Sequence, residues 1–193
     1  MPTIVETLTI QCRAGTIPSV LAVLEPFVRE TDAGCWVAEI GLLNRIIVMR
    51  VAANGEREAF QPPALPWPEE AVVEVEQDLW RVVGDAILSP GDYGPVYEFR
   101  CYDIFKDDVS EVERLFRDAL PKRLPYSPLL TAMVALDDSA RFCHVWPYRS
   151  LEERASLRRE AVAAALWPPK GMATLLETMR SEIYLAASFS AYL

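Results

Sequence analysis

The order of strand-like, helix-like and turn-forming segments in this 193-residue chain occurs twice, and this repetition constrains the fold more than any single motif. The first copy spans roughly residues 3–88 and the second roughly residues 96–193. Between them, residues 89–95 read Ser-Pro-Gly-Asp-Tyr-Gly-Pro, which are residue types that interrupt regular structure. We therefore expect two modules, residues 1–90 and residues 91–193.

Each copy begins with a strand-like segment rich in β-branched or aromatic residues, residues 5–10 and residues 97–102. An amphipathic helix follows, and two apolar runs separated by a short turn then predict a hairpin. Each copy ends on another strand-like run, residues 78–88 and residues 181–192. The predicted order is β-α-β-β-α-β in both copies.

Prolines and capping residues refine the predicted helices. Pro26 and Pro121 lie late in the first helix of each copy, where proline removes a backbone donor and is expected to kink or restart the helix. Residues 150–166 predict a second helix in the second copy, started by a capping box at Ser150. The corresponding residues 53–63 of the first copy are short, polar and proline-ended, and predict a single turn or a loop.

A sheet with this element order has one face covered by helices and one bare face, which must be buried against another sheet. A covalently linked second copy supplies that sheet without the entropic cost of association. The sequence therefore favours two sheets that close over each other within one chain.

Residues 144–154, HVWPYRSLEER, combine a strand ending in HxWPY with a helix opening in SLEER, and this segment resembles the NIPSNAP family. Residues 96–102, 120–124 and 179–183 are also similar to that family, and residues 39–45 look like its hairpin turn. The resemblance covers nearly all of the second copy and mainly this turn in the first.

The resemblance implies a dimeric α/β-barrel fold, with two four-stranded antiparallel sheets face to face and the helices outside. It also implies small-molecule sites between sheet and helices or inside the barrel. We predict an α+β protein in which two tandem ferredoxin-like modules, the first degenerate, form a single-chain pseudo-dimer. A homodimer of such pseudo-dimers is a further partner hypothesis.

Charge and composition exclude several classes of function. The chain carries 19 basic and 28 acidic residues, a net charge of −9, which disfavours nucleic acid and anionic membrane surfaces. No apolar run is long enough to span a membrane, and the N-terminus lacks the pattern of a signal peptide, so we expect a cytoplasmic protein. The four cysteines show no zinc-ligand spacing, and no nucleotide-binding or hydrolase motif occurs, so we expect neither a metal nor a cofactor.

His144 is the single histidine of the chain and the first candidate for chemistry. It suits general acid–base catalysis or haem ligation, and Trp146 lies on the same face of its strand. A histidine satisfied by hydrogen bonds inside the packed protein is the alternative interpretation.

Glu98, Arg100 and Tyr102 share one face of the strand at residues 97–102. The opposite face is more apolar and is expected to meet the helices, so these three side chains are expected between the two sheets. Charged groups there must be paired or bound to a ligand, and an internal ion pair to Glu98 or Glu39 is the alternative.

The first copy carries Glu39, Asn44 and Arg45 where the second has Ala135, Ala140 and Arg141, so we expect one polar pocket rather than two equal ones. The predicted catalytic residues are His144, Arg100, Glu98, Tyr102 and Glu39. The predicted substrate-binding residues are Trp146, Asn44, Arg45, Arg141 and Tyr148.

We predict from these residues a protein that binds a small apolar or aromatic metabolite. As an enzyme it would be a cofactor-independent isomerase, cyclase or monooxygenase of secondary metabolism, with His144 as acid or base and Arg100 stabilising negative charge. Two alternatives stay open, a non-catalytic protein-interaction module and a haem-binding protein that uses His144.

Overall fold

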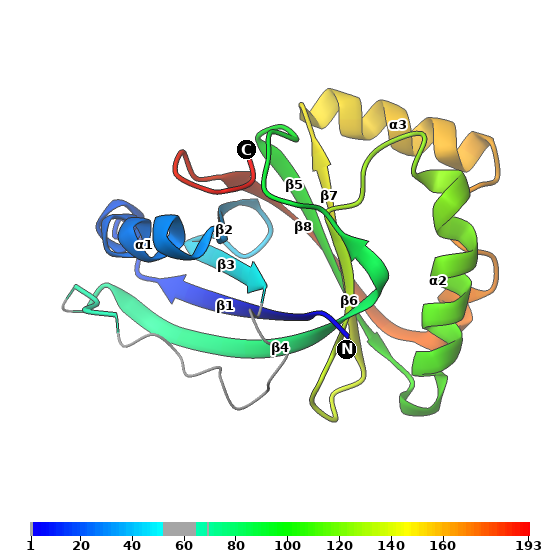
Figure 1. Cartoon of the computed structure of the whole chain (residues 1–193), viewed down its shortest axis with the longest axis horizontal. Helices are drawn as coiled ribbons and strands as arrows, with labels where there is room; N and C mark the ends of the chain where they lie inside the picture. The colour runs from blue at the N-terminus through cyan, green and yellow to red at the C-terminus, as the bar shows by residue number, and fades with distance from the viewer. Residues whose placement is uncertain (1, 52–64, 69) are drawn as a thin grey trace.

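The computed structural model describes residues 2–51, 65–68 and 70–193 (Figure 1). In this part of the chain the strands and helices are β1 (Ile4–Cys12), α1 (Ile17–Thr31), β2 (Gly34–Ile40), β3 (Arg45–Val51), β4 (Val72–Ile87), β5 (Val96–Ile104), α2 (Val109–Arg123), β6 (Thr131–Ala135), β7 (Arg141–Tyr148), α3 (Leu151–Ala163) and β8 (Leu176–Ala186). Two short 3-10 turns, η2 (Lys106–Asp108) and η3 (Met172–Leu175), precede α2 and β8. The predicted turn or loop at residues 53–63 lies outside the described residues.

The strands of the described chain form one closed antiparallel barrel in the order β1-β3-β2-β8-β5-β7-β6-β4. The strands of the first half lie as β4-β1-β3-β2, and those of the second half lie as β8-β5-β7-β6. The first strand of each half is therefore flanked by the last and the third of its own half. The pairs β2–β8 and β4–β6 join the halves and close the ring. The predicted α+β architecture is confirmed in this form.

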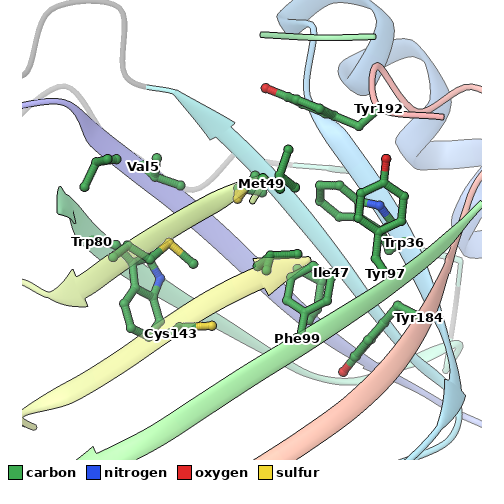
Figure 2. Close-up of a cluster of buried hydrophobic side chains, with 14 of the residues drawn as sticks. Val5, Trp36, Ile47, Met49, Trp80, Tyr97, Phe99, Cys143, Tyr184 and Tyr192 are labelled. Atoms are coloured by element: carbon green, nitrogen blue, oxygen red, sulfur yellow. The ribbon is translucent and has the colours of Figure 1, made fainter. Parts of the chain in front are cut away.

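The inside of the barrel is a packed apolar core to which both halves contribute (Figure 2). Trp36 of β2 lies at its centre, with ring centroids 5.2 Å from Tyr97 and 5.4 Å from Phe99 of β5. Val5 and Trp80 enter from β1 and β4. Because aromatic rings bury large apolar areas, this shared core is the main reason why the two sheets stay together.

The helices cover the outer faces of the barrel, α1 over the first half and α2 and α3 over the second (Figure 1). Both proline-containing helices run on without interruption, α1 through Pro26 and α2 through Pro121, so the expected restart is wrong. An interior proline costs about 3 kcal/mol. In α1 the side chains of Leu24 and Val28, on either side of Pro26, are fully buried, and each contributes about 1.5–3 kcal/mol of burial.

The predicted start of α3 is confirmed. The Ser150 hydroxyl accepts a hydrogen bond from the backbone N–H of Glu153 at 3.2 Å, and the Glu153 carboxylate accepts one from the N–H of Arg149 at 2.5 Å. At α2, Asp108 occupies the cap position, but within the described structure its side chain makes no capping hydrogen bond. None of the described helices has the length and apolar character that crossing a membrane requires.

Gly94 lies in the segment that joins the two halves, at a position with no room for a side chain. A substitution there should therefore lower the unfolding free energy. Its φ is +112°, and a Cβ there would overlap the carbonyl oxygen of Tyr148. We expect Gly94→Ala to lower the unfolding free energy by about 2–4 kcal/mol, from backbone strain and overpacking together. Gly15→Ala is the matched control, because φ is +83° there with nothing near the added methyl, so it should cost only about 1–2 kcal/mol. Equal losses in urea denaturation would contradict the clash at Gly94.

Candidate functional site

The polar face of β5 points toward the helices, which reverses the orientation predicted from the sequence. Tyr97 and Phe99 enter the barrel core, whereas Tyr102 packs on the opposite side of the sheet, among residues of α2 and β7. The physical reason is closure of the barrel. Side chains from both sheets fill its interior, where charged groups would lack partners, so the apolar face of β5 points inward and the polar face points outward. On the outer face, Glu98 and Arg100 can be reached by arginines from the helices.

Glu98 is the centre of this outer site and is 1% exposed. One of its carboxylate oxygens accepts hydrogen bonds from Arg154 and Arg158 of α3, at 2.6 Å and 3.1 Å, and from the Ser181 hydroxyl of β8 at 2.6 Å. Arg100 lies 4.0 Å away on the same strand. The carboxylate thus ties the sheet to α3.

The environment of Glu98 favours its charged form. Burial alone would raise the pKa of this carboxyl group, but hydrogen bonds from Arg154 and Ser181, together with the positive charges of Arg100 and Arg154, outweigh burial. The pKa of Glu98 is therefore lower than its ordinary value, and the group is ionised at neutral pH.

The site holds more positive than negative charge. Arg123, at the end of α2, is 2% exposed, and its guanidinium lies 4.6 Å from the centre of the Trp146 ring. With Arg100, Arg154 and Arg158 it makes four guanidinium groups around the single carboxylate of Glu98. Burial is the main cause that lowers the pKa of Arg123.

Three buried nitrogens of this arginine cluster lack a hydrogen-bond partner among the described residues. They are Nε of Arg100, Nη1 of Arg123 and Nε of Arg154. Buried donors of this kind are costly unless something fills their hydrogen bonds. The unmatched charge and the unmatched donors both leave room for an acceptor that the described residues do not supply.

A cavity of about 90 Å³ lies beside these groups, between the sheet and α3. We call it the helix-side cavity. Its lining consists of Glu98, Arg100, Arg123, Trp146, Tyr148, Arg158, Ala161, Val162, Trp167 and Pro168. One wall is therefore cationic and another is aromatic. A cavity that encloses benzene has a volume of roughly 150 Å³. The helix-side cavity is smaller, so it accommodates a carboxylate or phosphate group but not a whole aromatic ring.

His144 lies behind this cavity and is fully buried. Its Nδ1 accepts a hydrogen bond from the Trp146 indole N–H at 2.5 Å, and its Nε2 lacks a partner among the described residues. The rings of Phe116, Phe142 and Trp167 pack around it. Burial, followed by the charges of Arg100 and Arg123, holds the pKa of His144 well below its ordinary value, so the imidazole is neutral.

The other predicted site residues do not join this cluster, so the structure does not bring all of them together in one pocket. Glu39 is exposed on β2, and Asn44 lies in the β2–β3 turn with φ of +57°. Arg45 and Arg141 begin β3 and β7 and line a different cavity, at one end of the barrel. Strand alternation explains the separation, because Arg45 and Arg141 point to the barrel side of the sheet and Glu98 points to the helix side.

Trp146 lies on the same face of β7 as His144, as predicted, and Tyr148 lies beside Glu98. Sequence reasoning missed Arg123, Arg154 and Arg158. Arg154 and Arg158 are four residues apart and therefore share a face of α3, and this spacing was the available signal. No such pattern marks Arg123, whose partners come from other elements.

Comparison with solved structures shows the fold. A protein from Lactobacillus acidophilus NCFM superposes with a TM-score of 0.66 at 6% identity, over 96% of this chain and 94% of that one. A protein from Fusobacterium nucleatum gives a TM-score of 0.63 at 8% identity, over 96% and 92%. Both are named "putative monooxygenase". A NIPSNAP-like domain protein from Burkholderia xenovorans is 27% identical over 51% of this chain and 90% of its own, with a TM-score of 0.47.

The chain is thus an α+β protein with an antiparallel barrel and outer helices, and a polar, arginine-rich site lies under α3. The NIPSNAP family model matches residues 97–191, so the second half of the chain carries a NIPSNAP domain. The resemblance seen in residues 144–154 is confirmed. The comparison with curated proteins found no match.

Proposed function

We propose that this protein binds a small organic anion in the helix-side cavity, with its carboxylate or phosphate end against the arginine cluster. The observation that carries the proposal is the set of four guanidinium groups around one carboxylate, with three buried N–H groups unmatched in the described chain. The planar guanidinium group of arginine can donate two parallel hydrogen bonds to one carboxylate or phosphate group.

The size of the cavity divides the ligand into two parts. The charged end fills the roughly 90 Å³ next to Arg100 and Arg123. An apolar or aromatic body then lies along Trp167, Pro168 and Val162, where the lining is apolar. This division agrees with the expectation of an aromatic or apolar metabolite and adds an anionic group to it.

A more specific form of this proposal is that the protein is an enzyme that acts on the bound anion. Solved structures with this fold include two proteins named "putative monooxygenase", which supports cofactor-independent oxygenation over isomerisation or cyclisation as the reaction. In that reaction Arg100 and Arg123 would stabilise developing negative charge. His144 is separated from the cavity by Trp146, so its use as a base requires the Trp146 ring to move.

The two alternatives have less support. Haem ligation through His144 would have to displace the aromatic rings packed around it. A protein-interaction role is favoured by one observation, the exposed apolar side chains of Ile40, Leu42 and Leu43 at the β2–β3 turn. Sedimentation of the purified chain tests the simplest such partner, a second copy, and a monomer at all concentrations would contradict it.

Several expectations from the sequence stay predictions. The strand order common to both halves supports two tandem modules, residues 1–90 and 91–193, folded as a pseudo-dimer. The cytoplasmic location rests on the sequence alone. Native mass spectrometry of protein purified from its own host would show whether a small anion is retained.

Arg158→Gln is expected to weaken binding of benzoate and phenyl phosphate at least tenfold. Arg158 is 40% exposed at its side chain, so the unfolding free energy should change by less than about 1 kcal/mol. The matched control is Arg159→Gln, since Arg159 is exposed on the same helix and does not line the cavity. Titration calorimetry at two salt concentrations measures the affinities.

Benzamide has the shape of benzoate without its charge, and it should bind at least tenfold more weakly. Equal affinity for benzoate and benzamide, or equal losses in Arg158→Gln and Arg159→Gln, would contradict the proposed anion site.

A further inference from the structure

Three sulfur-containing side chains lie side by side on the barrel face of the second sheet. Cys143 of β7 is in register with Cys101 of β5 on one side and with Met133 of β6 on the other. Directly paired residues of antiparallel strands project to the same face, with Cβ atoms about 4.5–5.5 Å apart. The side chains of Cys143 and Met133 are each 1% exposed, and Cys101 is partly exposed.

The three sulfurs also line one cavity, which we call the barrel-end cavity. It has a volume of about 90 Å³, and all three residues belong to its lining together with Trp80 and Phe99. Figure 2 shows the Cys143 sulfur on the barrel face near Trp80 and Phe99. A hydrogen bond to the Cys101 thiol, followed by burial, raises the pKa of Cys143, as expected of two thiols in contact.

The charged groups at the open side of this cavity balance each other. Three arginines and three carboxylates line it, Arg45, Arg141 and Arg180 with Glu76, Asp78 and Glu182. Arg141 is paired with Asp78 at 2.6 Å. The sulfurs therefore lie under a rim of zero net charge, where a species with one negative charge meets no net repulsion.

We propose that Cys101, Cys143 and Met133 form a binding site for a soft monovalent metal ion, Cu(I). Thiolate and thioether sulfurs select Cu(I) over the harder divalent ions. On binding, the two S–H bonds break, two Cu–S bonds form and two protons leave to solvent, with no change in oxidation state. The resulting bis-thiolate complex carries one negative charge under a rim of zero net charge, and Met133 supplies a third, neutral ligand.

The ligand set separates Cu(I) from zinc. Among the described residues, no group of three or more His, Cys, Asp or Glu side chains could hold a metal ion. Zinc in a structural site takes four such ligands, so the two thiols fall short of it. Cu(I) accepts two or three soft ligands, and a methionine counts among them.

The other two cysteines provide an internal contrast. Cys12 and Cys35 are buried in the apolar cluster under α1 and do not line the barrel-end cavity. A cysteine that only fills space needs no cavity beside its sulfur. Cys101 and Cys143 combine a paired thiol, a neighbouring thioether and open space for an ion.

The test is an anaerobic titration of the full-length chain with Cu(I), in competition with the chromophoric chelator bicinchoninate. We expect one Cu(I) per chain and an affinity that rises with pH, because the ion displaces thiol protons. The double variant Cys101→Ser/Cys143→Ser should lose at least 100-fold in affinity. The double variant Cys12→Ser/Cys35→Ser is the matched control and should bind as the wild type does.

Met133→Leu conserves volume and keeps the barrel packed. We expect it to weaken Cu(I) binding about tenfold, and X-ray absorption of the wild-type complex should show sulfur ligands alone. Equal affinity in the two double-cysteine variants, or nitrogen and oxygen ligands at the copper edge, would overturn the proposal. So would a Cys101–Cys143 disulfide formed by mild oxidants in a protein that binds no Cu(I).

Discussion

Glu98→Gln should lower the unfolding free energy at pH 7 by about 3–5 kcal/mol, although the two side chains have nearly the same shape. The substitution removes the negative charge to which Arg154 and Arg158 bind, and leaves the largely buried Arg154 and Arg100, whose side chains are 22% and 18% exposed, without a paired carboxylate. Removing one partner of a buried ion pair typically costs this much, because the remaining charge is desolvated and uncompensated. Urea denaturation measures the loss.

The same variant should bind benzoate more tightly, by about tenfold. Glu98 occupies donors of Arg154 and Arg158 that a ligand carboxylate would otherwise use. If the Glu98 carboxylate occupies the anion site in the absence of ligand, its removal should lower the unfolding free energy and raise the affinity for benzoate. Weaker benzoate binding in Glu98→Gln would show instead that Glu98 aligns the arginines for the ligand.

Glu6→Gln is the matched control for this experiment. Glu6 occupies the corresponding strand of the first half, is also 1% exposed, and accepts hydrogen bonds from Arg50 and Gln77. It should destabilise the protein without changing the affinity for benzoate, since Glu6 does not line the helix-side cavity.

Acidification provides a second measurement on Glu98. The pKa of Glu98 is depressed in the folded protein, so its stabilising contribution is complete above the ordinary value of 4.5 and is lost as pH falls through the folded pKa. The stability difference between wild type and Glu98→Gln should therefore shrink below pH 4.5. A difference that stays constant down to pH 3 would contradict the depressed pKa.

The fold could be predicted from the sequence because its signals are local. Alternating apolar residues, turn-forming residues and the Ser150 cap each specify an element without knowledge of the rest of the chain. The strand at residues 78–88 was nevertheless predicted too short, since β4 begins at Val72. Residues 72–77 include two exposed glutamates, Glu74 and Glu76, and the pairing of this segment with β1 outweighs its weak strand propensity.

The site could be predicted only in part, because its geometry depends on long-range contacts. Period-two alternation correctly grouped Glu98, Arg100 and Tyr102 on one face of β5. Alternation does not say which face meets the helices, and the more apolar face turned out to fill the barrel. The partners of Glu98 come from α3 and β8, 56 to 83 residues further along the chain. No local pattern connects residues so far apart.

His144 should make the protein less stable as the pH falls below 6.5, by about 1.4 kcal/mol per pH unit. Its pKa is far below 6.5 in the folded protein, mainly because it is buried. Below pH 6.5 the unfolded chain therefore binds one proton that the folded chain does not, and acid favours unfolding. The loss between pH 6.5 and pH 5 should reach about 2 kcal/mol.

The measurement is clean because the chain contains a single histidine. Urea denaturation of wild type and His144→Gln at pH 7.5, 6.5, 5.5 and 5.0 gives two stability profiles. The variant loses ring contacts with Phe116 and Trp167 and should be less stable throughout, but its profile should be flat over this range. The slope therefore separates titration of the imidazole from the loss of packing.

The same slope decides which chemistry His144 can perform. A neutral imidazole whose Nδ1 already accepts the Trp146 N–H has no lone pair free on Nε2, so it can act as a base only after that hydrogen bond breaks. It can act as an acid only by losing the Nε2 proton, which is unfavourable at neutral pH. A flat wild-type profile would mean that His144 is protonated in the folded protein as readily as in the unfolded chain. That result would contradict a neutral His144 in the folded protein and favour its role as an acid or base.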